Sequence, residues 1–295
     1  MDVGGSAIKL GVLARDGSER REDTLPVERG DAAAALFART AARLSELAGG
    51  PLERVGVGLP GLLDRAAGRV RNSPNLPWLE GVPVAEVLAR PLGLDESAVR
   101  LENDANVAAL GEQWLGAARG ARELLLLTLG TGIGGGLILG GELFAGAGMA
   151  GEVGHVTVDP DGLPCGCGAR GCLETLASAT AARRRALELG LPAAAPGDLV
   201  LLAARARERA GPERELLEAV GYDLGRGLAA VIALLDLRLF VFGGGFSAAL
   251  DVLEPGVRRA LGEWVYGGRE PEVELRAATL GASAGWIGAA RLALA

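Results

Sequence analysis

Apolar and polar positions along the chain follow two periods, one typical of buried strands and one typical of amphipathic helices. Up to about residue 107, short apolar runs alternate with longer segments of helical period. The elements predicted there are a hairpin strand at Ile8 to Leu13, a helix at Asp31 to Leu47, strands at Arg54 to Leu59 and Val99 to Leu101, and a helix at Ala105 to Leu115. Strands interleaved with helices predict a mixed α/β fold.

A second run of the same kind begins near Glu123. The elements predicted there are a strand at Leu124 to Leu129, a glycine-rich turn at Gly130 to Gly136, a resumed strand at Leu137 to Leu139, helices at Ser178 to Leu189, Asp198 to Glu208 and Pro212 to Leu235, a strand at Arg238 to Phe242 and a helix from Ser283 onward. Two similar halves predict two lobes with a central cleft. We expect a small lobe over 1–107, completed by the C-terminal helix over 282–295, and a large lobe over 108–281.

Composition and charge exclude several classes of protein. Hydrophobic residues make up 49% of the chain, so we expect an ordered molecule. The net charge is −7 and Lys and Arg form no dense cluster, so we expect no nucleic-acid partner. The start lacks a basic and apolar leader, and the most apolar C-terminal stretch carries Asp236 and Arg238. We therefore expect a soluble cytoplasmic protein with no signal peptide and no membrane partner.

All three cysteines and the single histidine lie between His155 and Cys172. Three thiolates and one imidazole supply a closed tetrahedral shell for Zn²⁺, with no open position for a catalytic water. Chance clustering is improbable in a chain of 295 residues, and a disulfide would leave one thiol over and does not suit the cytosol. The sequence therefore predicts a structural zinc site formed by His155, Cys165, Cys167 and Cys172.

Three glycine-rich turns follow predicted strands, at Gly4 to Ser6, Gly130 to Gly136 and Gly243 to Gly245. Such turns let backbone N–H groups approach phosphate oxygens, and the hydroxyls of Ser6 and Thr131 add donors. The second turn also matches the dinucleotide fingerprint G-x-G-x-x-G, but a strand rather than a helix follows it. A plain hairpin is the simpler interpretation of any single turn, whereas three turns together favour phosphate binding.

Polar residues also gather at a predicted strand-to-helix junction, Glu102 to Asn106. Helix capping by Asn or Asp is the simpler interpretation. However, the carboxyl end of a strand in an α/β sheet is also where ligands bind. There, Asp104 can accept a proton from a substrate hydroxyl while Asn103 holds another hydroxyl.

Acidic residues flank the cysteine segment, Glu152 before it and Glu174 after it. They are either an ordinary solvated pair or polar contacts for a polyol on a loop that the metal holds rigid. His155 can bind zinc through one ring nitrogen and offer the other to a sugar hydroxyl. The alternatives stay open on these residues alone.

Taken together, these motifs resemble the ROK family (repressors, open reading frames and kinases). The matching segments are Asp-Val-Gly-Gly-Ser from 2, Glu-Asn-Asp-Ala-Asn from 102, Gly-Thr-Gly-Ile-Gly-Gly-Gly from 130, Gly-Glu-Val-Gly-His from 151, Cys-Gly-Cys-Gly-Ala-Arg-Gly-Cys-Leu-Glu from 165 and Phe-Gly-Gly-Gly from 242. The resemblance implies an actin-like, ribonuclease-H-like fold with ATP in the cleft. It also implies a homodimer or higher homo-oligomer.

The segment from Cys172 to Thr180 looks most like the glucokinases of this family. The resemblance therefore implies ATP-dependent phosphorylation of a hexose at its primary hydroxyl, with glucose as the first substrate and Mg²⁺ and structural Zn²⁺ as metals. A fructokinase, an N-acetylmannosamine kinase or another sugar kinase of the family would carry nearly the same motifs.

The resemblance also implies roles for individual residues. Asp104 matches the family's catalytic base, and Asp2 would lie near Mg²⁺. The residues that match sugar ligands are Asn103, Glu152, His155, Glu174, Gly61 and Asn75. The residues that match the nucleotide site are Asp2, Gly4, Gly5, Ser6, Gly130, Thr131, Gly132, Gly134, Gly135, Gly243, Gly244 and Gly245.

Two other classes of function are weighed against a kinase. Sugar-responsive repressors of the family carry an N-terminal helix-turn-helix, for which this chain has no room, and the acidic charge argues against DNA binding. A non-catalytic sugar-binding protein is disfavoured by the intact Asp104 and glycine turns. One departure favours it, because only Met1 precedes Asp2 where family members have several apolar residues. We therefore expect either that the chain as written starts too late or that the first strand is truncated and Asp2 is poorly anchored.

Overall fold

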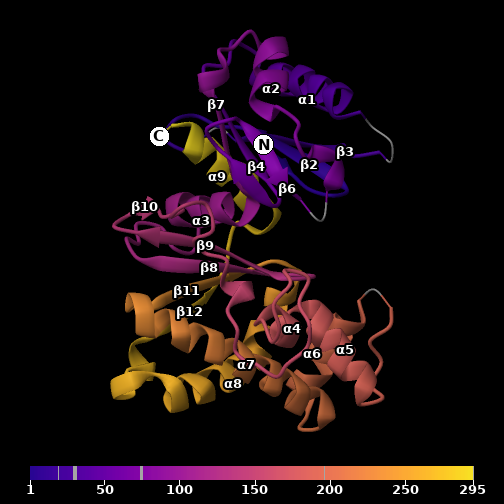
Figure 1. Cartoon of the computed structure of the whole chain (residues 1–295), viewed down its shortest axis with the longest axis vertical. Coiled ribbons are helices and arrows are strands. Elements are labelled where there is room, and N and C mark those ends of the chain that lie inside the picture. The colour runs from indigo at the N-terminus through magenta and orange to yellow at the C-terminus, as the bar shows by residue number, and fades with distance from the viewer. Residues whose placement is uncertain (19, 29–31, 74–75, 196, 295) are drawn as a thin grey trace. The chain divides into compact units, whose positions relative to one another are not determined.

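The computed structural model describes residues 1–18, 20–28, 32–73, 76–195 and 197–294 (Figure 1). Asn75, a predicted sugar ligand, lies outside them. The strands are β1 (Asp2–Val3), β2 (Ala7–Val12), β3 (Arg21–Pro26), β4 (Val55–Leu59), β5 (Leu62–Asp64), β6 (Arg69–Asn72), β7 (Val99–Asn103), β8 (Leu124–Leu129), β9 (Ile133–Leu139), β10 (Glu142–Leu143), β11 (Leu239–Gly243) and β12 (Glu274–Ala277). The α-helices are α1 (Ala33–Ala48), α2 (Val84–Leu92), α3 (Asp104–Leu115), α4 (Glu174–Ala177), α5 (Ala179–Glu188), α6 (Asp198–Glu208), α7 (Pro212–Leu235), α8 (Leu250–Trp264) and α9 (Ala284–Ala293).

Two five-stranded sheets repeat one strand order, β3-β2-β1-β4-β7 and β10-β9-β8-β11-β12, and β5 pairs with β6 in a third sheet. In the first sheet, β1 is antiparallel to β2 and parallel to β4, which is parallel to β7. In the second, β11 is parallel to both β8 and β12. The mixed α/β fold and the two similar halves predicted from the sequence are therefore confirmed.

The chain forms two compact units. The first comprises Met1–Ala121, Gly136–Ala150 and Thr279–Ala295, and the second comprises Arg122–Gly135 and Gly151–Ala278. The N-terminal strands and helix α9 thus belong to one unit. These units are defined by packing alone, so the functional lobes expected to meet at residue 107 stay a prediction.

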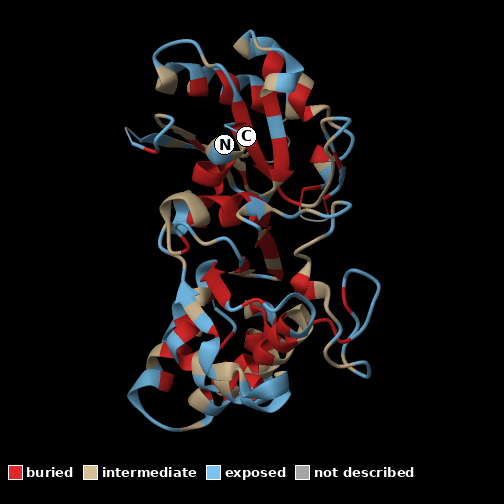
Figure 2. Cartoon of the chain, turned by 90° about the vertical axis from the view of Figure 1, so that its left-hand side faces the viewer, coloured by how far each residue is buried: buried red, intermediate tan, exposed pale blue. Residues whose placement is uncertain are grey.

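Helix α9 lies closely against the sheet of the first unit. A Cβ atom at Gly56 in β4 would lie only 1.7 Å from the carbonyl oxygen of Ala289, so only glycine permits this approach. Trp286 of α9 is 1% exposed and covers Gly11 of β2. Figure 2 shows that buried residues follow the strands. The packing of α9 therefore helps to fix the strands whose ends carry the candidate site.

The second glycine-rich turn is shorter than expected. The sequence predicted a turn up to Gly136, but β9 begins at Ile133, so Gly134 and Gly135 lie within a strand. Their lack of side chains still matters, because a Cβ at Gly135 would lie 2.3 Å from the carbonyl oxygen of Gly151. A strand does follow the turn, which confirms that the dinucleotide fingerprint lacks the helix it needs.

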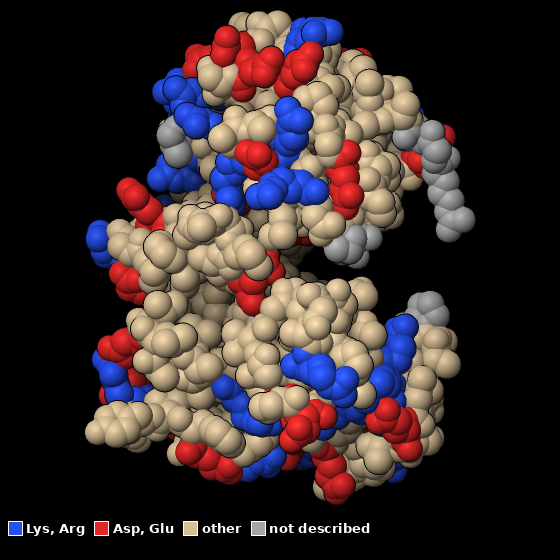
Figure 3. Space-filling view, in the orientation of Figure 1, with Lys and Arg blue, Asp and Glu red and all other residues tan. Residues whose placement is uncertain are grey.

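Charged side chains of both signs occur on the surface of the protein. On the face seen in Figure 3, basic and acidic side chains lie interspersed. Among the described residues, the structure contains no helix of the length and apolarity that crossing a bilayer would need.

Candidate functional site

The first unit places several predicted site residues at one edge of its sheet. Strands β1, β4 and β7 run parallel, so their carboxyl ends meet at the same edge. Asp2 lies in β1, Gly61 follows β4 and Asn103 ends β7. Ligands of α/β proteins bind at this end of the strands.

Asp2 is well anchored, which corrects the expectation of a loose first strand. In the sheet, the backbone of Asp2 is paired with Lys9 of β2 on one side and with Gly58 of β4 on the other. Met1, which precedes it, is buried. Burial raises the pKa of the Asp2 carboxyl, and the nearby Lys9 charge offsets part of this rise. A half-buried carboxylate of raised pKa is a group that a bound cation would stabilise.

The turn after β1 is closed by a 3.0 Å hydrogen bond from the backbone N–H of Gly4 to the carbonyl of Ala7. Gly5 and Ser6 at its tip are exposed. The tight turn between two short strands is the one predicted from the sequence. Its predicted contacts with phosphate stay a prediction.

Asn103 both caps α3 and reaches across the sheet edge. Its Oδ1 accepts hydrogen bonds from the backbone N–H groups of Ala105 and Asn106, at 2.9 and 3.3 Å. Its Nδ2 donates to the carbonyl of Gly61 at 3.3 Å. Helix capping by Asn103 is therefore confirmed. The same contacts fix the Asn103 side chain next to Asp104, which is the first residue of α3 and is exposed.

Gly61 occupies a position that no other residue would tolerate. Its φ is 99°, and a Cβ atom there would lie 2.1 Å from the carbonyl oxygen of Asn72. The glycine thus lets the segment after β4 turn sharply toward Asn103. The predicted proximity of Gly61 to a bound sugar stays a prediction.

Glu102, directly before Asn103, carries a network that sequence reasoning missed. It is 3% exposed and forms an ion pair with Arg65. It also accepts hydrogen bonds from the backbone N–H of Asn103 at 2.7 Å and from Nδ2 of Asn106 at 2.9 Å. The partner Arg65 lies 37 positions away, so no local spacing pointed to it.

In the second unit, two glycine turns lie at the carboxyl ends of neighbouring parallel strands. Gly243 of β11 is paired in register with Thr128 of β8. Gly244 has a φ of 82°, and a Cβ there would lie 2.4 Å from the carbonyl oxygen of Leu129. The structure therefore brings together the turn at Gly130 and the turn at Gly243, which lie far apart in the sequence.

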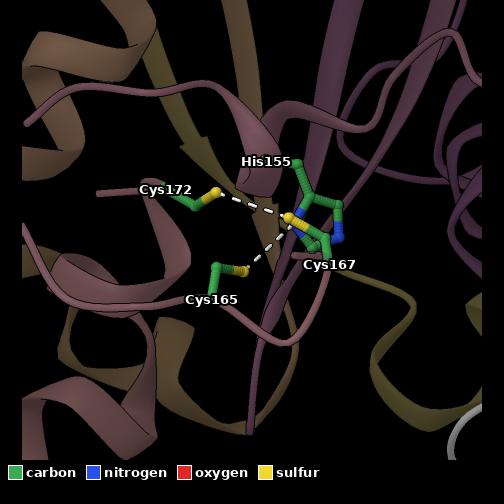
Figure 4. A group of neighbouring side chains, drawn as sticks. All are labelled: His155, Cys165, Cys167 and Cys172. Atoms are coloured by element: carbon green, nitrogen blue, oxygen red, sulfur yellow. Dashed lines mark hydrogen bonds between the residues drawn. The ribbon is translucent and has the colours of Figure 1, made fainter. Parts of the chain in front are cut away.

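The cysteine segment and His155 form one cluster, with their ligand atoms all within 4.8 Å of one another (Figure 4). Sγ of Cys165 lies 3.6 Å from Nδ1 of His155, and the sulfurs of Cys167 and Cys172 are also 3.6 Å apart. A tetrahedral Zn²⁺ with bonds of about 2.3 Å to sulfur has ligands about 3.8 Å apart. The four side chains therefore fit zinc in both chemistry and spacing.

The thiols of this cluster have shifted pKa values. Burial raises the pKa of Cys165 to about 12 and also raises that of Cys172. The backbone N–H of Ala169 lowers the pKa of Cys167. A bound divalent cation would hold all three as thiolates at neutral pH, because metal binding displaces their protons.

Glu174, at the start of α4, links this cluster to the second glycine turn. Its Oε1 accepts a hydrogen bond of 3.2 Å from the Cys165 thiol and lies 3.7 Å from Nδ1 of His155. Its Oε2 lies so close to Gly132 that a Cβ there would be 2.6 Å away. Glu152 is half-buried, and its carbonyl accepts a hydrogen bond from the backbone N–H of His155.

Comparison with known proteins covers the whole chain. A model of the ROK family matches residues 1–295. The chain is 37% identical to a glucokinase of Thermotoga maritima, over 99% of this chain and 95% of the relative.

Two solved structures are similar over 99% of the chain. One is a ROK hexokinase from Thermus thermophilus, with a TM-score of 0.83, 36% identity and 96% of that chain covered. The other is a ROK family glucokinase from Streptomyces griseus in complex with glucose and AMPPNP, with a TM-score of 0.78, 34% identity and 97% of that chain covered. Together with the two sheets of equal order, this likeness confirms the actin-like fold.

Proposed function

This chain belongs to the ROK family, and from that premise we propose that it is an ATP-dependent kinase that phosphorylates glucose at its primary hydroxyl. The observation that carries the proposal is its near full-length likeness to a glucokinase structure in complex with glucose and AMPPNP. The Asn103–Asp104 junction and the glycine turns supply the polar groups that this chemistry needs.

Asp104 is proposed as the general base. Its carboxylate accepts the proton of the sugar's primary hydroxyl while that oxygen bonds to the γ-phosphorus of ATP. The bond between the γ-phosphorus and the bridging oxygen breaks, and ADP leaves. Its position at the exposed start of α3, beside the fixed side chain of Asn103, supports this role.

The sugar and nucleotide sites follow from the family motifs. The residues proposed to hold the sugar are Asn103, Glu152, His155, Glu174, Gly61 and Asn75. The residues proposed to hold the nucleotide are Gly4, Gly5, Ser6, Gly130, Thr131, Gly132, Gly134, Gly135, Gly243, Gly244 and Gly245. The contact between Glu174 and the Gly132 turn supports a shared role for the two sets.

Two metal ions belong to the proposal. Asp2 would hold Mg²⁺, which neutralises phosphate charge when bound. Zn²⁺ would be held by His155, Cys165, Cys167 and Cys172, and would fix the loop that carries Glu174. We also propose a cytoplasmic homodimer or higher homo-oligomer, supported by the family resemblance and measurable by analytical ultracentrifugation.

The test is ADP release from Mg·ATP with a panel of hexoses and N-acetylhexosamines, with Asp104→Asn as the control. We expect release with glucose in clear preference, and a loss of about 10²- to 10⁴-fold in the variant, the usual contribution of a general base. A preference for fructose or N-acetylmannosamine would assign another sugar. No release with any sugar, from folded protein loaded with zinc, would contradict a kinase.

A further inference from the structure

Cys167 differs from the other two cysteines of the chain in its exposure. Cys165 is 8% exposed and Cys172 is 0% exposed, whereas Cys167 is an exposed residue. Glycines stand on both sides of it. Apart from the adjoining residues in the chain, no atom of the described residues lies within 4 Å of where a Cβ at Gly166 or Gly168 would be. A small reagent dissolved in water therefore reaches Cys167 more readily than either other cysteine.

A second thiol lies beside this exposed one. Sγ of Cys172 is 3.6 Å from Sγ of Cys167 (Figure 4). A disulfide joins two sulfurs at about 2.05 Å, so the sulfurs need to approach each other by only about 1.5 Å. Gly168, next to Cys167, has a φ of 95° and open space around it. The exposed end of the loop can therefore make this approach while the buried Cys172 stays in place.

The third thiol, that of Cys165, is turned to other partners. The ligand atoms of the cluster all lie within 4.8 Å of one another, so distance alone does not choose between pairs of cysteines. However, the Cys165 thiol donates a hydrogen bond of 3.2 Å to Oε1 of Glu174, and its Sγ lies 3.6 Å from Nδ1 of His155. Exposure and hydrogen bonding together favour the pair of Cys167 and Cys172, with Cys165 as the thiol left over.

We propose that Cys167 is an oxidation site for hydroperoxides, and that Cys172 converts the oxidised sulfur into a disulfide. With hydrogen peroxide, the sulfur of Cys167 attacks one oxygen, the O–O bond breaks, and a sulfenic acid and one water form. The sulfur of Cys172 then attacks that of Cys167, and the S–S bond forms as the S–O bond breaks. The hydroxyl group leaves with the proton of Cys172 as a second water. Two thiols thus lose two electrons, and one peroxide is reduced to two waters.

The disulfide has a consequence for the proposed metal site. It removes two of the four proposed zinc ligands, and His155 and Cys165 alone do not complete a tetrahedral shell. Cys172 lies two positions before Glu174, a proposed sugar ligand, so the loss of zinc reaches the sugar site. This consequence rests on the function proposed above, whereas the disulfide itself does not. Thiols reverse such a bond by exchange, so the oxidation is a reversible switch.

The test adds hydrogen peroxide to the purified wild type, whose zinc content is measured beforehand, and maps the cysteines by mass spectrometry. Trypsin cuts after Arg170 and so separates Cys167 from Cys172. We expect two of the three thiols to be lost in one disulfide between these residues, and to return with dithiothreitol. Cys165→Ser should form the same disulfide. Cys172→Ser should stop at a sulfenic acid on Cys167, which dimedone traps.

The matched control is Cys167→Ser, which should keep both of its thiols under the same treatment. A disulfide that contains Cys165, or oxidation that leaves Cys167 a free thiol, would overturn the proposal. The map of the wild type decides the pairing alone, so the result does not depend on the folding of a variant.

A chelating dye measures the consequence for zinc. One zinc should leave for each disulfide formed, and zinc retained by the disulfide-bonded protein would contradict the switch. None of these measurements uses kinase activity, so a chain that forms the disulfide but phosphorylates no hexose would contradict the proposed function alone. In a chain that does phosphorylate glucose, oxidation should raise KM for glucose, and dithiothreitol with zinc should restore it.

Discussion

Nε of Arg65 donates a 2.7 Å hydrogen bond to Oε2 of Glu102, and the two side chains form an ion pair directly ahead of Asn103. Glu102 is buried, whereas the side chain of Arg65 is 31% exposed. Glu102 also accepts hydrogen bonds from the backbone N–H of Asn103 and from Nδ2 of Asn106. The pair thus connects the segment after β5 to the junction that carries the proposed base.

We expect Arg65→Met to lower kcat more than tenfold, because a shift of the junction by about 1 Å can cost about 10²-fold in rate. Removing one partner of a fully buried ion pair costs about 3–5 kcal/mol of stability. The loss in Arg65→Met should be smaller, because Arg65 is partly exposed. The double variant Arg65→Met/Glu102→Gln should recover much of the stability, since no unpaired charge remains. Steady-state kinetics and urea unfolding measure both effects, and an unchanged kcat in Arg65→Met would rule out a positioning role.

The zinc cluster gives a second prediction. Cys165→Ser should fail to bind the zinc that we propose for the wild type, because serine is a poor ligand for this ion. The melting temperature should fall, and KM for glucose should rise more than KM for ATP, since Glu174 and His155 adjoin the cluster. Elemental analysis and kinetics measure these changes. A variant with full zinc content, or with unchanged glucose KM after zinc loss, would contradict this account.

Much of the fold could be predicted from the sequence because its periods are strong. Helix α7 begins and ends at the predicted residues, and the strand predicted at Arg54 to Leu59 is β4 within one residue. The start of β9 could not be predicted, because glycines that usually mark a turn also permit a strand in close contact with its neighbours.

Some features of the candidate site could likewise be predicted from the sequence, and others could not. The cluster of possible metal ligands could be predicted because rare residue types lie close together along the chain, and the capping role of Asn103 because it follows a strand. Arg65 was missed because its ion pair with Glu102 depends on tertiary packing.

Glu112 leads to a prediction about stability within the first unit. This carboxylate is fully buried in α3 and accepts hydrogen bonds from the backbone N–H groups of Ala117, Thr279 and Leu280. Glu112→Gln puts an NH₂ group against some of these donors, so unfolding free energy should fall by about 1–3 kcal/mol.

The matched control is Glu86→Gln, whose partner is the exposed Arg90 one turn away. We expect it to change the free energy of unfolding by no more than about 0.5 kcal/mol. Urea unfolding of both variants at neutral pH makes the comparison. Equal effects of the two substitutions would show that Glu112 does not hold the segment before α9 to α3.

Asp2 should make the free protein less stable at neutral pH than at low pH. Burial raises its pKa above the ordinary value of 3.8, so the folded state binds a proton that the unfolded state has already lost. Stability therefore falls as pH rises from 3.8 through the folded pKa and stays lower above it. Asp2→Asn removes this cost, so without nucleotide the variant should be more stable than the wild type at pH 7, and the difference should vanish in acid.

The variant Asp251→Asn provides a control of opposite sign. Hydrogen bonds from Arg207 lower the pKa of Asp251, so its stabilising contribution is present at neutral pH and is lost as pH falls through the folded pKa. Urea unfolding between pH 3 and 7 measures the free energy of unfolding. At pH 7 this free energy should be higher for Asp2→Asn than for the wild type, and lower for Asp251→Asn. Mg·ATP should stabilise the wild type and not Asp2→Asn, because the carboxylate that destabilises the free protein is the proposed Mg²⁺ contact. If Asp2→Asn is less stable than the wild type at pH 7, the half-buried carboxylate stabilises the free protein, which would contradict this prediction.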